Sequence, residues 1–203
     1  MPRSSEQNQA IKDKRRVHII KAAIKVFAEN GYDKIAIDDI TRAAACSHGL
    51  FYHYFKNKEE ILTAIVNENI RAGGMLPPCH DANERGSING IKLICDYLAD
   101  CYVGTSGHIS TGLVAVSFPR YENLPKALKK IASDNDLENT LVTLIAQGQK
   151  DHKIIAGEPK EIARGAMHII VGNFDTLLRD GRNAPIVSTD VLYNMLLLGE
   201  REA

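Results

Sequence analysis

The segment from Ile37 to Val66 constrains this chain more than any other, because it carries two short helical patterns on either side of a tight turn. The first pattern spaces apolar residues along one helix face from Ile37 to Ala44. The turn follows at Ala45-Cys46-Ser47, and the second pattern places aromatic and polar side chains outward. This arrangement is typical of a helix-turn-helix, whose second helix can lie in a groove of DNA.

Local signals set the ends of the helices around this segment. Apolar residues at helical spacing predict a first helix from about Arg15 to Glu29, and the polar residues 1–11 before it are expected to be mobile. Ser47 can cap the third helix through its hydroxyl group. Asn57, with Glu60 three residues later, indicates a variant of the capping box at the start of a fourth helix.

The rest of the chain also predicts helices. Residues 73–86 are rich in glycine and proline, so we expect a connector there, an amino-terminal domain at 1–72 and a carboxy-terminal domain at 73–203. Further helical patterns follow at about 88–102, 109–118, 124–149 with a bend near 133–136, 159–179, and from 188 or 189 to 199. No alternating pattern of useful length predicts a strand. The expected fold is therefore all-α.

Charge and cysteine content exclude several classes of function. The 25 basic and 25 acidic residues cancel, which argues against broad, charge-driven coating of nucleic acid. The basic run from Lys12 to Arg16 either contacts phosphate or is a solvated surface. The four cysteines form no C-x-x-C pair and no zinc pattern, so we expect no metal and no cofactor. The common catalytic motifs are absent as well, and we expect no catalytic residues and no enzyme.

The sequence also bears on location. It shows neither a signal peptide nor an apolar run long enough to cross a membrane, so we expect a cytoplasmic protein with reduced thiols and no membrane partner. Cys95 and Cys101 lie six residues apart, a spacing that does not align them on one helix face, and a redox pair is not favoured.

A characteristic set of residues surrounds the turn. It comprises Phe27, Gly31-Tyr32, Asp39-Ile40, Ser47-His48-Gly49, Phe51, Tyr52, Tyr54, Phe55, Lys56, Lys58 and Glu60. With these residues the segment 15–65 resembles the TetR family of bacterial transcription regulators. The resemblance implies a three-helix DNA-binding domain followed by a helical domain that binds a ligand and forms dimers. Beyond residue 72 it rests on the number and order of helices alone.

Three residues depart from the family pattern. Ala36 stands where the family usually has Thr or Ser as the cap of the second helix, and losing such a cap costs about 1 kcal/mol. Ala45 replaces the usual turn glycine and carries strain of about 1 kcal/mol or more if that position needs a positive φ. Cys46 replaces a usual valine, and we expect it to be a small core residue.

The resemblance implies that the helix after the turn reads DNA, while Phe51 and Phe55 face the core. The residues expected at the DNA are Ser47, His48, Gly49, Leu50, Tyr52, His53, Tyr54 and Lys58. The alternative is that they merely line a protein surface. A pH switch or metal site at the two histidines is not favoured, because no third ligand is near in the sequence.

Individual roles follow from chemistry. Leu50 can meet a thymine methyl group in the major groove, and Gly49 lets the backbone approach DNA closely. Tyr52 and Tyr54 resemble family positions that bond phosphates through their hydroxyl groups. Lys58, together with the amides that begin the fourth helix, can hold one phosphate.

In the resembling family an effector lies among the carboxy-terminal helices, in an apolar cavity with a few polar anchors. The candidate effector contacts are the polar and aromatic residues scattered within those helices: Tyr97, Cys101, His108, Phe118, Tyr121, His168 and Phe174. The alternative for each is an ordinary core or interface role.

The last two helices are candidates for a dimer interface, because the final one is apolar nearly all round and needs cover on more than one side. The interface candidates are Ile162, Ala166, Ile169, Ile170, Phe174, Leu177, Val191, Leu192, Met195 and Leu196. The alternative is burial within one chain.

The expected function is that of a homodimeric transcriptional repressor, which binds a near-palindromic double-stranded DNA operator and is released from it by an unknown small-molecule effector. One alternative is a DNA-binding regulator without such an effector, acting as an activator or answering to a protein partner. Another is a helical enzyme or carrier with a vestigial DNA-binding domain.

Overall fold

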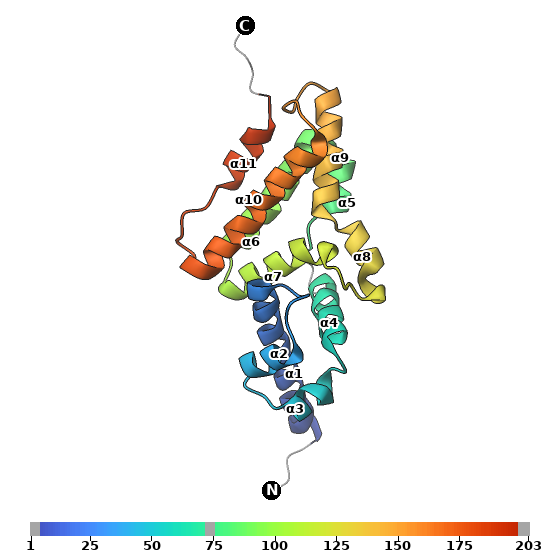
Figure 1. The fold of residues 1–203 in the computed structure, drawn as a ribbon, viewed down its shortest axis with the longest axis vertical. Helices are drawn as coiled ribbons and strands as arrows, with labels where there is room; N and C mark the ends of the chain where they lie inside the picture. Colours follow the sequence, from blue (N-terminus) through green and yellow to red (C-terminus); the bar gives the residue numbers. More distant parts are fainter. Residues whose placement is uncertain (1–4, 72–75, 199–203) are drawn as a thin grey trace.

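The computed structural model describes residues 5–71 and 76–198, which form eleven α-helices and two 3₁₀-helices (Figure 1). The elements are α1 (Ser5–Asn30), α2 (Ile37–Ala43), α3 (His48–Tyr54), α4 (Lys58–Arg71), α5 (Cys79–Glu84), α6 (Ser87–Val103), α7 (Ser106–Ser117), η1 (Phe118–Arg120), η2 (Lys126–Leu128), α8 (Lys129–Asp134), α9 (Leu137–Lys150), α10 (Pro159–Asp180) and α11 (Thr189–Leu196). Within the described ranges the only strand-like pairing is an isolated bridge between Ile154 and Leu197. The predicted all-α fold is confirmed.

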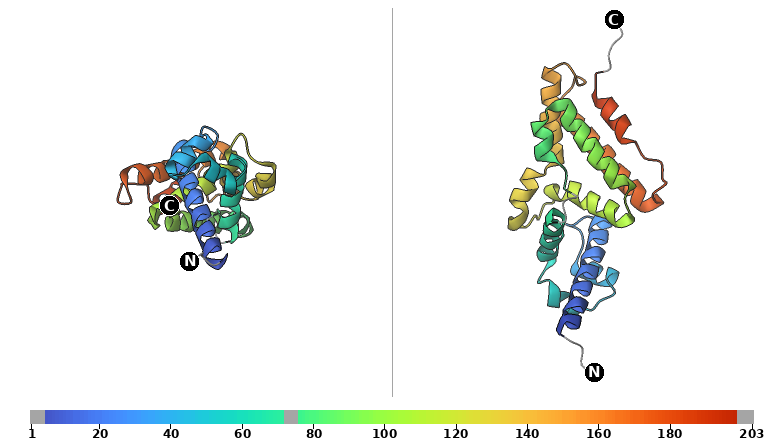
Figure 2. Two further views of the ribbon diagram at one scale, coloured as in Figure 1. Left: turned by 90° about the horizontal axis from the view of Figure 1, so that it is seen from below. Right: turned by 180° about the vertical axis from the view of Figure 1, so that it is seen from behind.

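The helices form two groups along the long axis of the molecule. We call α1 to α4 the amino-terminal unit and the elements from residue 76 onward the carboxy-terminal unit. Figure 2 shows the two units from behind at opposite ends, with α7 running across the middle. None of the helices described is long and apolar enough to cross a membrane.

The buried apolar residues form two clusters, and the boundary between the clusters does not coincide with the boundary between the two units. One cluster is made by α5, α6, α7, α9, α10 and α11. The other unites α1 to α4 with four buried residues from the carboxy-terminal unit, Val114, Phe118, Leu128 and Ala132. The two units therefore share a core at their junction, and α1 packs closely along α7.

Two predictions about local structure need correction. Residues 5–11 are helical rather than mobile, because α1 begins at Ser5, well before the expected Arg15; Glu, Gln and Ala in this stretch favour helix without packing. Residues 79–84, expected to be part of a connector, form α5 because Cys79 and Ala82 are buried against the core. The predicted bend near 133–136 is a break between α8 and α9. The last helix ends at Leu196, with Leu197 extended, and the predicted end at residue 199 lies outside the described residues. The other helices lie close to their predicted positions.

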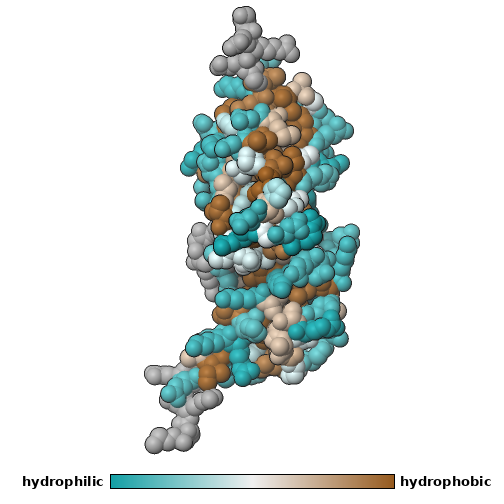
Figure 3. Space-filling model, turned by 90° about the vertical axis from the view of Figure 1, so that its left-hand side faces the viewer, coloured by the Kyte–Doolittle hydropathy of each residue, from teal (hydrophilic) through white to brown (hydrophobic). Residues whose placement is uncertain are grey.

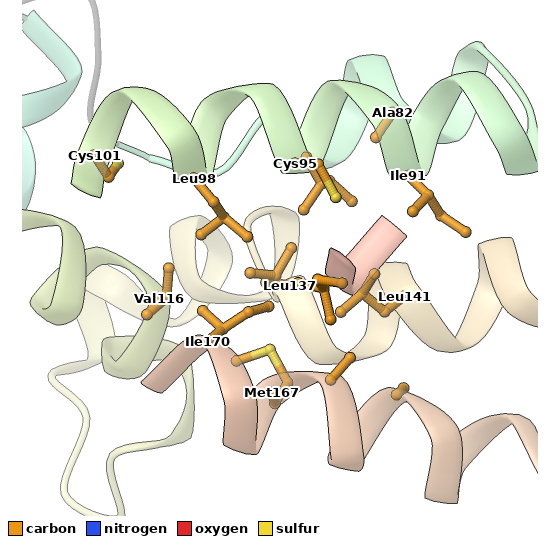
Figure 4. Packing of buried hydrophobic residues seen from close by; sticks show 14 of the residues in the cluster. Ala82, Ile91, Cys95, Leu98, Cys101, Val116, Leu137, Leu141, Met167 and Ile170 are labelled. Carbon is orange, nitrogen blue, oxygen red and sulfur yellow. The ribbon is translucent and has the colours of Figure 1, made fainter. Parts of the chain in front are cut away.

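The carboxy-terminal core is densely filled. Figure 4 shows apolar side chains from α6 and α10 pointing into the space between these helices. At Gly112 on α7, an added Cβ would lie 2.8 Å from the ring of Phe174 and 3.4 Å from the Cβ of Cys101. Only glycine therefore fits where α7 crosses α6 and α10.

Candidate nucleic-acid interface

Helix α2 begins without a side-chain cap, as Ala36 requires. The other half of the capping arrangement is present, because the Ala36 N–H donates to Asp39 Oδ2 at 2.9 Å. Asp38 and Asp39 also stand at the positive end of the helix dipole. These contacts offset part of the missing cap.

The turn between α2 and α3 holds Ala45 at a φ of 46°, in the left-handed region. An alanine there is strained by about 1 kcal/mol, as the sequence predicted. Two contacts hold the turn in place: the Cys46 N–H donates to the Thr41 carbonyl at 3.0 Å, and His18 Nε2 lies 3.1 Å from the Ala44 carbonyl oxygen. The geometry of the turn is therefore retained without its usual glycine.

Cys46 itself is half-buried and packs against the amino-terminal core. Partial burial raises the pKa of its thiol above the ordinary value. It is therefore a small packing residue at the edge of the core.

Helix α3 is anchored from beneath and capped at its start. The Ser47 hydroxyl accepts a hydrogen bond from the Leu50 N–H at 3.2 Å, which confirms the predicted cap. Phe51 and Phe55 are buried, as expected. Their burial fixes the rotation of α3 about its axis.

The opposite face of α3 is open. His48, Gly49, Tyr52 and His53 are exposed, with Tyr52 at 52% of its full surface. Leu50 and Tyr54 are half-buried, and Tyr54 packs against the amino-terminal core. The outward face is therefore aromatic and polar, with ring nitrogens and a hydroxyl group that can reach base edges or phosphates.

One carboxylate borders this face. His48 Nε2 lies 3.4 Å from Asp38 Oδ1, at the point where the starts of α2 and α3 meet. The Asp38 carboxylate would repel a phosphate placed beside it.

Lys58 has a different role from the one expected. Its ammonium donates to the carbonyl oxygens of Tyr32 at 2.7 Å and Ile35 at 3.0 Å, with a longer contact of 3.5 Å to Asp33. It also lies 4.4 Å from the centre of the Tyr32 ring. These contacts occupy the ammonium, so we do not retain Lys58 as a phosphate contact; it anchors the loop of residues 31–36 to α4.

The start of α4 is capped by its own residues. The Asn57 side chain accepts from the Glu60 N–H at 2.8 Å, and the Glu60 carboxylate accepts from the Lys56 N–H at 2.6 Å. This confirms the predicted variant of the capping box. It also occupies the Glu60 amide, which the expected phosphate site would have used.

Part of the basic run on α1 is already engaged in contacts within the protein. Arg16 forms an ion pair with Glu68 of α4, and its guanidinium lies 5.3 Å from the centre of the Phe55 ring. Lys12, Lys14 and Arg15 are exposed. Only these three remain available for phosphate.

The residues expected to line an effector site do not converge. Cys101 and Phe174 lie in the carboxy-terminal core, and Tyr97 packs against it. Phe118 belongs to the amino-terminal core and Tyr121 packs on that core, whereas His108 and His168 are exposed. Exposed histidines cannot line an internal cavity, so this expectation is reduced to the first three residues.

Of these three residues, Cys101 and Phe174 are buried and Tyr97 is half-buried. Burial raises the pKa of Cys101 to about 11 and the pKa of Tyr97 well above its ordinary value, and the two side chains are hydrogen-bonded to each other. Nearby, the Tyr102 hydroxyl donates to the Ile170 carbonyl oxygen at 3.3 Å. These polar groups find partners within the chain itself.

Most residues expected at a dimer interface are buried inside one chain. The six that serve the intramolecular core are Ala166, Ile170, Phe174, Leu177, Leu192 and Leu196. Val191 and Met195 are exposed by 49% and 54%, and Ile162 and Ile169 are half-buried. The apolar stripe of α10 faces α6, α7 and α9, which is why its pattern alone suggested an interface.

We do not treat two other surface features as functional sites. A hollow of about 430 Å³ on the outer side of α6 is lined by Arg85, Asn89, Lys92, Leu93 and Asp96. Among the residues described, His80, Asp81 and Glu84 are the one group close enough to hold a metal ion, and all three are exposed. Neither feature has a buried polar group directed into it.

Comparison with known proteins agrees with this geometry. Residues 19–65 match the model for bacterial regulatory proteins of the tetR family. The fatty acid metabolism regulator protein of Bacillus subtilis (strain 168) is 43% identical over 54 residues, 27% of this chain and 28% of that protein. The chain thus aligns with little more than a quarter of that relative's length.

Two solved structures match over nearly the whole chain. A mutant of HlyIIR covers 97% of this chain and 98% of its own, with a TM-score of 0.63 at 20% identity. AibR, solved in complex with isovaleryl coenzyme A and operator DNA, covers 89% of this chain and 94% of its own, with a TM-score of 0.56 at 14% identity. These likenesses show a common fold. Residues 19–65 of this chain therefore match the tetR family of bacterial regulatory proteins, and the chain as a whole shares the fold of these two solved structures.

Proposed function

We propose that this protein is a homodimeric transcriptional repressor that reads a near-palindromic operator with α3. The observation that carries the proposal is the face of α3. Its residues His48, Gly49, Tyr52 and His53 are exposed while Phe51 and Phe55 hold the helix from beneath. Ser47, Leu50 and Tyr54 complete the proposed contact surface. We also propose that the protein acts in the cytoplasm, where it would meet an operator.

Two copies of α3 are needed to read a palindrome, and an exposed apolar stripe supplies a surface for pairing. It comprises Val187, Val191, Met195 and Leu198, exposed by 37%, 49%, 54% and 46%. Val191 and Met195 lie one turn apart on the same side of α11, Val187 and Leu198 lie just before and just after that helix, and the neighbouring Leu192 and Leu196 are buried. Figure 3, seen from the side on which α11 lies in Figure 1, shows apolar surface on the half of the molecule that holds the carboxy-terminal unit. We propose that a second copy covers this stripe.

A small molecule is the proposed signal for release. AibR, which shares this fold, was solved with both a coenzyme A ester and operator DNA. In the present chain the region around Tyr97, Cys101 and Phe174 is the proposed site. An effector would act by binding better to a state whose two α3 helices are wrongly spaced for DNA.

A specific observation favours a second candidate, a regulator without a small-molecule effector. The space between α6, α7 and α10 is filled, since a single added methyl group at Gly112 would clash with Phe174. A ligand would have to open this core. A regulator answering to a protein partner needs no such opening.

Operator binding is tested by mobility shift of the purified protein on DNA from the region upstream of its own gene, across a salt series. We expect affinity that falls steeply with salt, because phosphate contacts release counterions. Tyr52→Phe removes one hydroxyl group and should weaken binding by about five- to tenfold. Tyr193→Phe on α11 is the matched control and should bind like the wild type.

A folded dimer that shows no preference over random DNA would require a selection from genomic fragments. Failure of that selection would refute the proposal. The stripe on α11 is tested by sedimentation of Met195→Glu, which should become monomeric, with Val17→Glu on α1 as the control. A Met195→Glu protein that stays dimeric would refute the proposed interface.

A further inference from the structure

The carboxylate of Asp33, in the loop of residues 31–36, accepts hydrogen bonds from the carboxy-terminal unit. Asp33 Oδ1 accepts hydrogen bonds from the backbone N–H and the side-chain amide of Asn123, and Oδ2 accepts from the Glu122 N–H, all at 3.1 Å. Burial opposes ionisation of Asp33, yet these donors hold its pKa below the ordinary value. The carboxylate therefore links the loop to Glu122 and Asn123, which follow Asp33 by 89 and 90 residues.

The same loop is held from a second side. Lys58 at the start of α4 donates to the carbonyl oxygens of Tyr32 and Ile35. The Tyr32 ring is buried and stacks on Tyr121, with ring centres 5.2 Å apart and planes inclined by 16°. Residues 31–36 thus lie where α4 and the segment 121–123 both attach.

This loop leads directly into the helix-turn-helix. Ile35 and Ile40 are buried in the same core, and the Ala36 N–H is bonded to Asp39 in the first turn of α2. A displacement of the loop must therefore move α2, and α3 packs against α2.

We propose that Asp33 and Asn123 are positioning residues, which latch the DNA-reading unit to the carboxy-terminal unit in one orientation. The inference rests on the proposed function. The shared apolar core already holds the units together, but apolar contact is non-directional, whereas three hydrogen bonds to one carboxylate fix an orientation. A signal that shifts residues 121–123 then reaches α3 through this loop, beside the route along α4.

The latch is tested on the full-length protein with Asp33→Asn, Asn123→Ala and the double variant. Amide exchange by NMR should speed up about tenfold at residues 122 and 123 in Asp33→Asn, whose neutral side chain is the weaker acceptor, and less in Asn123→Ala, which removes one of the three hydrogen bonds and keeps both backbone donors. In Asp33→Asn exchange in residues 37–54 should also rise and operator affinity should fall several-fold, and the double variant should fall short of the sum of the single effects because both substitutions affect the side-chain hydrogen bond between residues 33 and 123.

Two further variants separate a latch from general damage. Glu122→Gln removes a charge from the same segment but keeps its N–H donor, so it should behave as the wild type. Asp33→Asn combined with Asn123→Asp exchanges the amide and the carboxylate and should restore part of the protection and affinity. Thermal unfolding of each variant establishes that it is folded.

Two results would overturn the latch. One is faster exchange at residues 122 and 123 with unchanged exchange in residues 37–54, which would make the contact purely local. The other is an effect of the double variant equal to the sum of the single effects. A wild-type protein that binds no operator refutes the proposed function instead, while the exchange measurements still decide the latch.

Discussion

Asn173 and Val187 exchange two hydrogen bonds: the Asn173 side-chain amide donates to the Val187 carbonyl oxygen at 2.7 Å, and the Val187 N–H donates to Asn173 Oδ1 at 3.1 Å. Asn173 is only 5% exposed, on a helix otherwise packed with apolar residues. The pair ties the segment that precedes α11 to α10. It therefore sets where α11, with its exposed apolar side, is presented.

Asn173→Ala should lower the free energy of unfolding by about 2–3 kcal/mol, because it leaves two backbone groups of Val187 without partners. Urea unfolding followed by circular dichroism measures this. The exposed Asn89 provides the control, and Asn89→Ala should change stability by less than about 0.5 kcal/mol. Equal losses of unfolding free energy in the two variants would show that the hydrogen bonds between Asn173 and Val187 do not stabilise the fold.

Gly112→Ala should destabilise the protein by about 1–3 kcal/mol, since the new methyl group would lie 2.8 Å from the Phe174 ring. Gly172→Ala on α10 is the opposite case, because nothing lies within 4 Å of its added Cβ, and it should stabilise the helix by about 0.5–1 kcal/mol. Calorimetry should give melting temperatures that move in opposite directions. A neutral Gly112→Ala would mean that the core there yields easily.

Lys58→Met should reduce stability by about 1–3 kcal/mol, because the carbonyl oxygens of Tyr32 and Ile35 lose a charged donor. The salt dependence of operator binding should keep its slope, whereas loss of a phosphate contact would reduce the slope by about one. Lys56→Met, at an exposed neighbour, controls for the lost charge. A reduced slope with unchanged stability would restore Lys58 to the DNA surface.

Alkaline pH should weaken the fold through its buried thiols. Burial raises the pKa of Cys79, Cys95 and Cys101 from 9.0 to about 11. Between these values the unfolded chain loses thiol protons that the folded chain keeps, so stability falls as pH rises from about 9 towards 11. Urea unfolding at a series of pH values measures the fall, which should be shallower in a variant with these three cysteines replaced by alanine.

The same burial predicts selective reactivity. In the native protein Cys46, which is half-buried, should react with an aromatic disulfide reagent well before the other three thiols. Reaction of all four at one rate would contradict the packing described for α5 and α6.

Much of the fold could be predicted from sequence because its signals are local. Apolar spacing and the caps at Ser47 and Asn57 each involve residues within one or two turns, and the structure confirms them. The left-handed Ala45 was visible as a departure from a turn glycine. Helix α5 was missed because six residues beside prolines carry little periodicity and owe their helix to burial of Cys79 and Ala82.

The sequence could not reveal contacts between residues that lie far apart along the chain. The apolar stripe of α10 identifies a buried face but not what covers it, and the covering helices belong to the same chain. Lys58 was assigned from its position, whereas its ammonium binds carbonyl oxygens that precede it by 23 to 26 residues. Asp33 and Asn123 were not singled out, since a contact over 90 residues leaves no pattern in either segment.

The junction between the units has a consequence for protein engineering. A graft made with one cut between the two units would divide a shared core. Here Val114, Phe118, Leu128 and Ala132 complete the core of α1 to α4, so a graft ending near residue 72 would leave an apolar surface uncovered. A transplantable unit must include the patch formed by residues 114–132, so a single crossover near residue 72 cannot transfer the amino-terminal core intact.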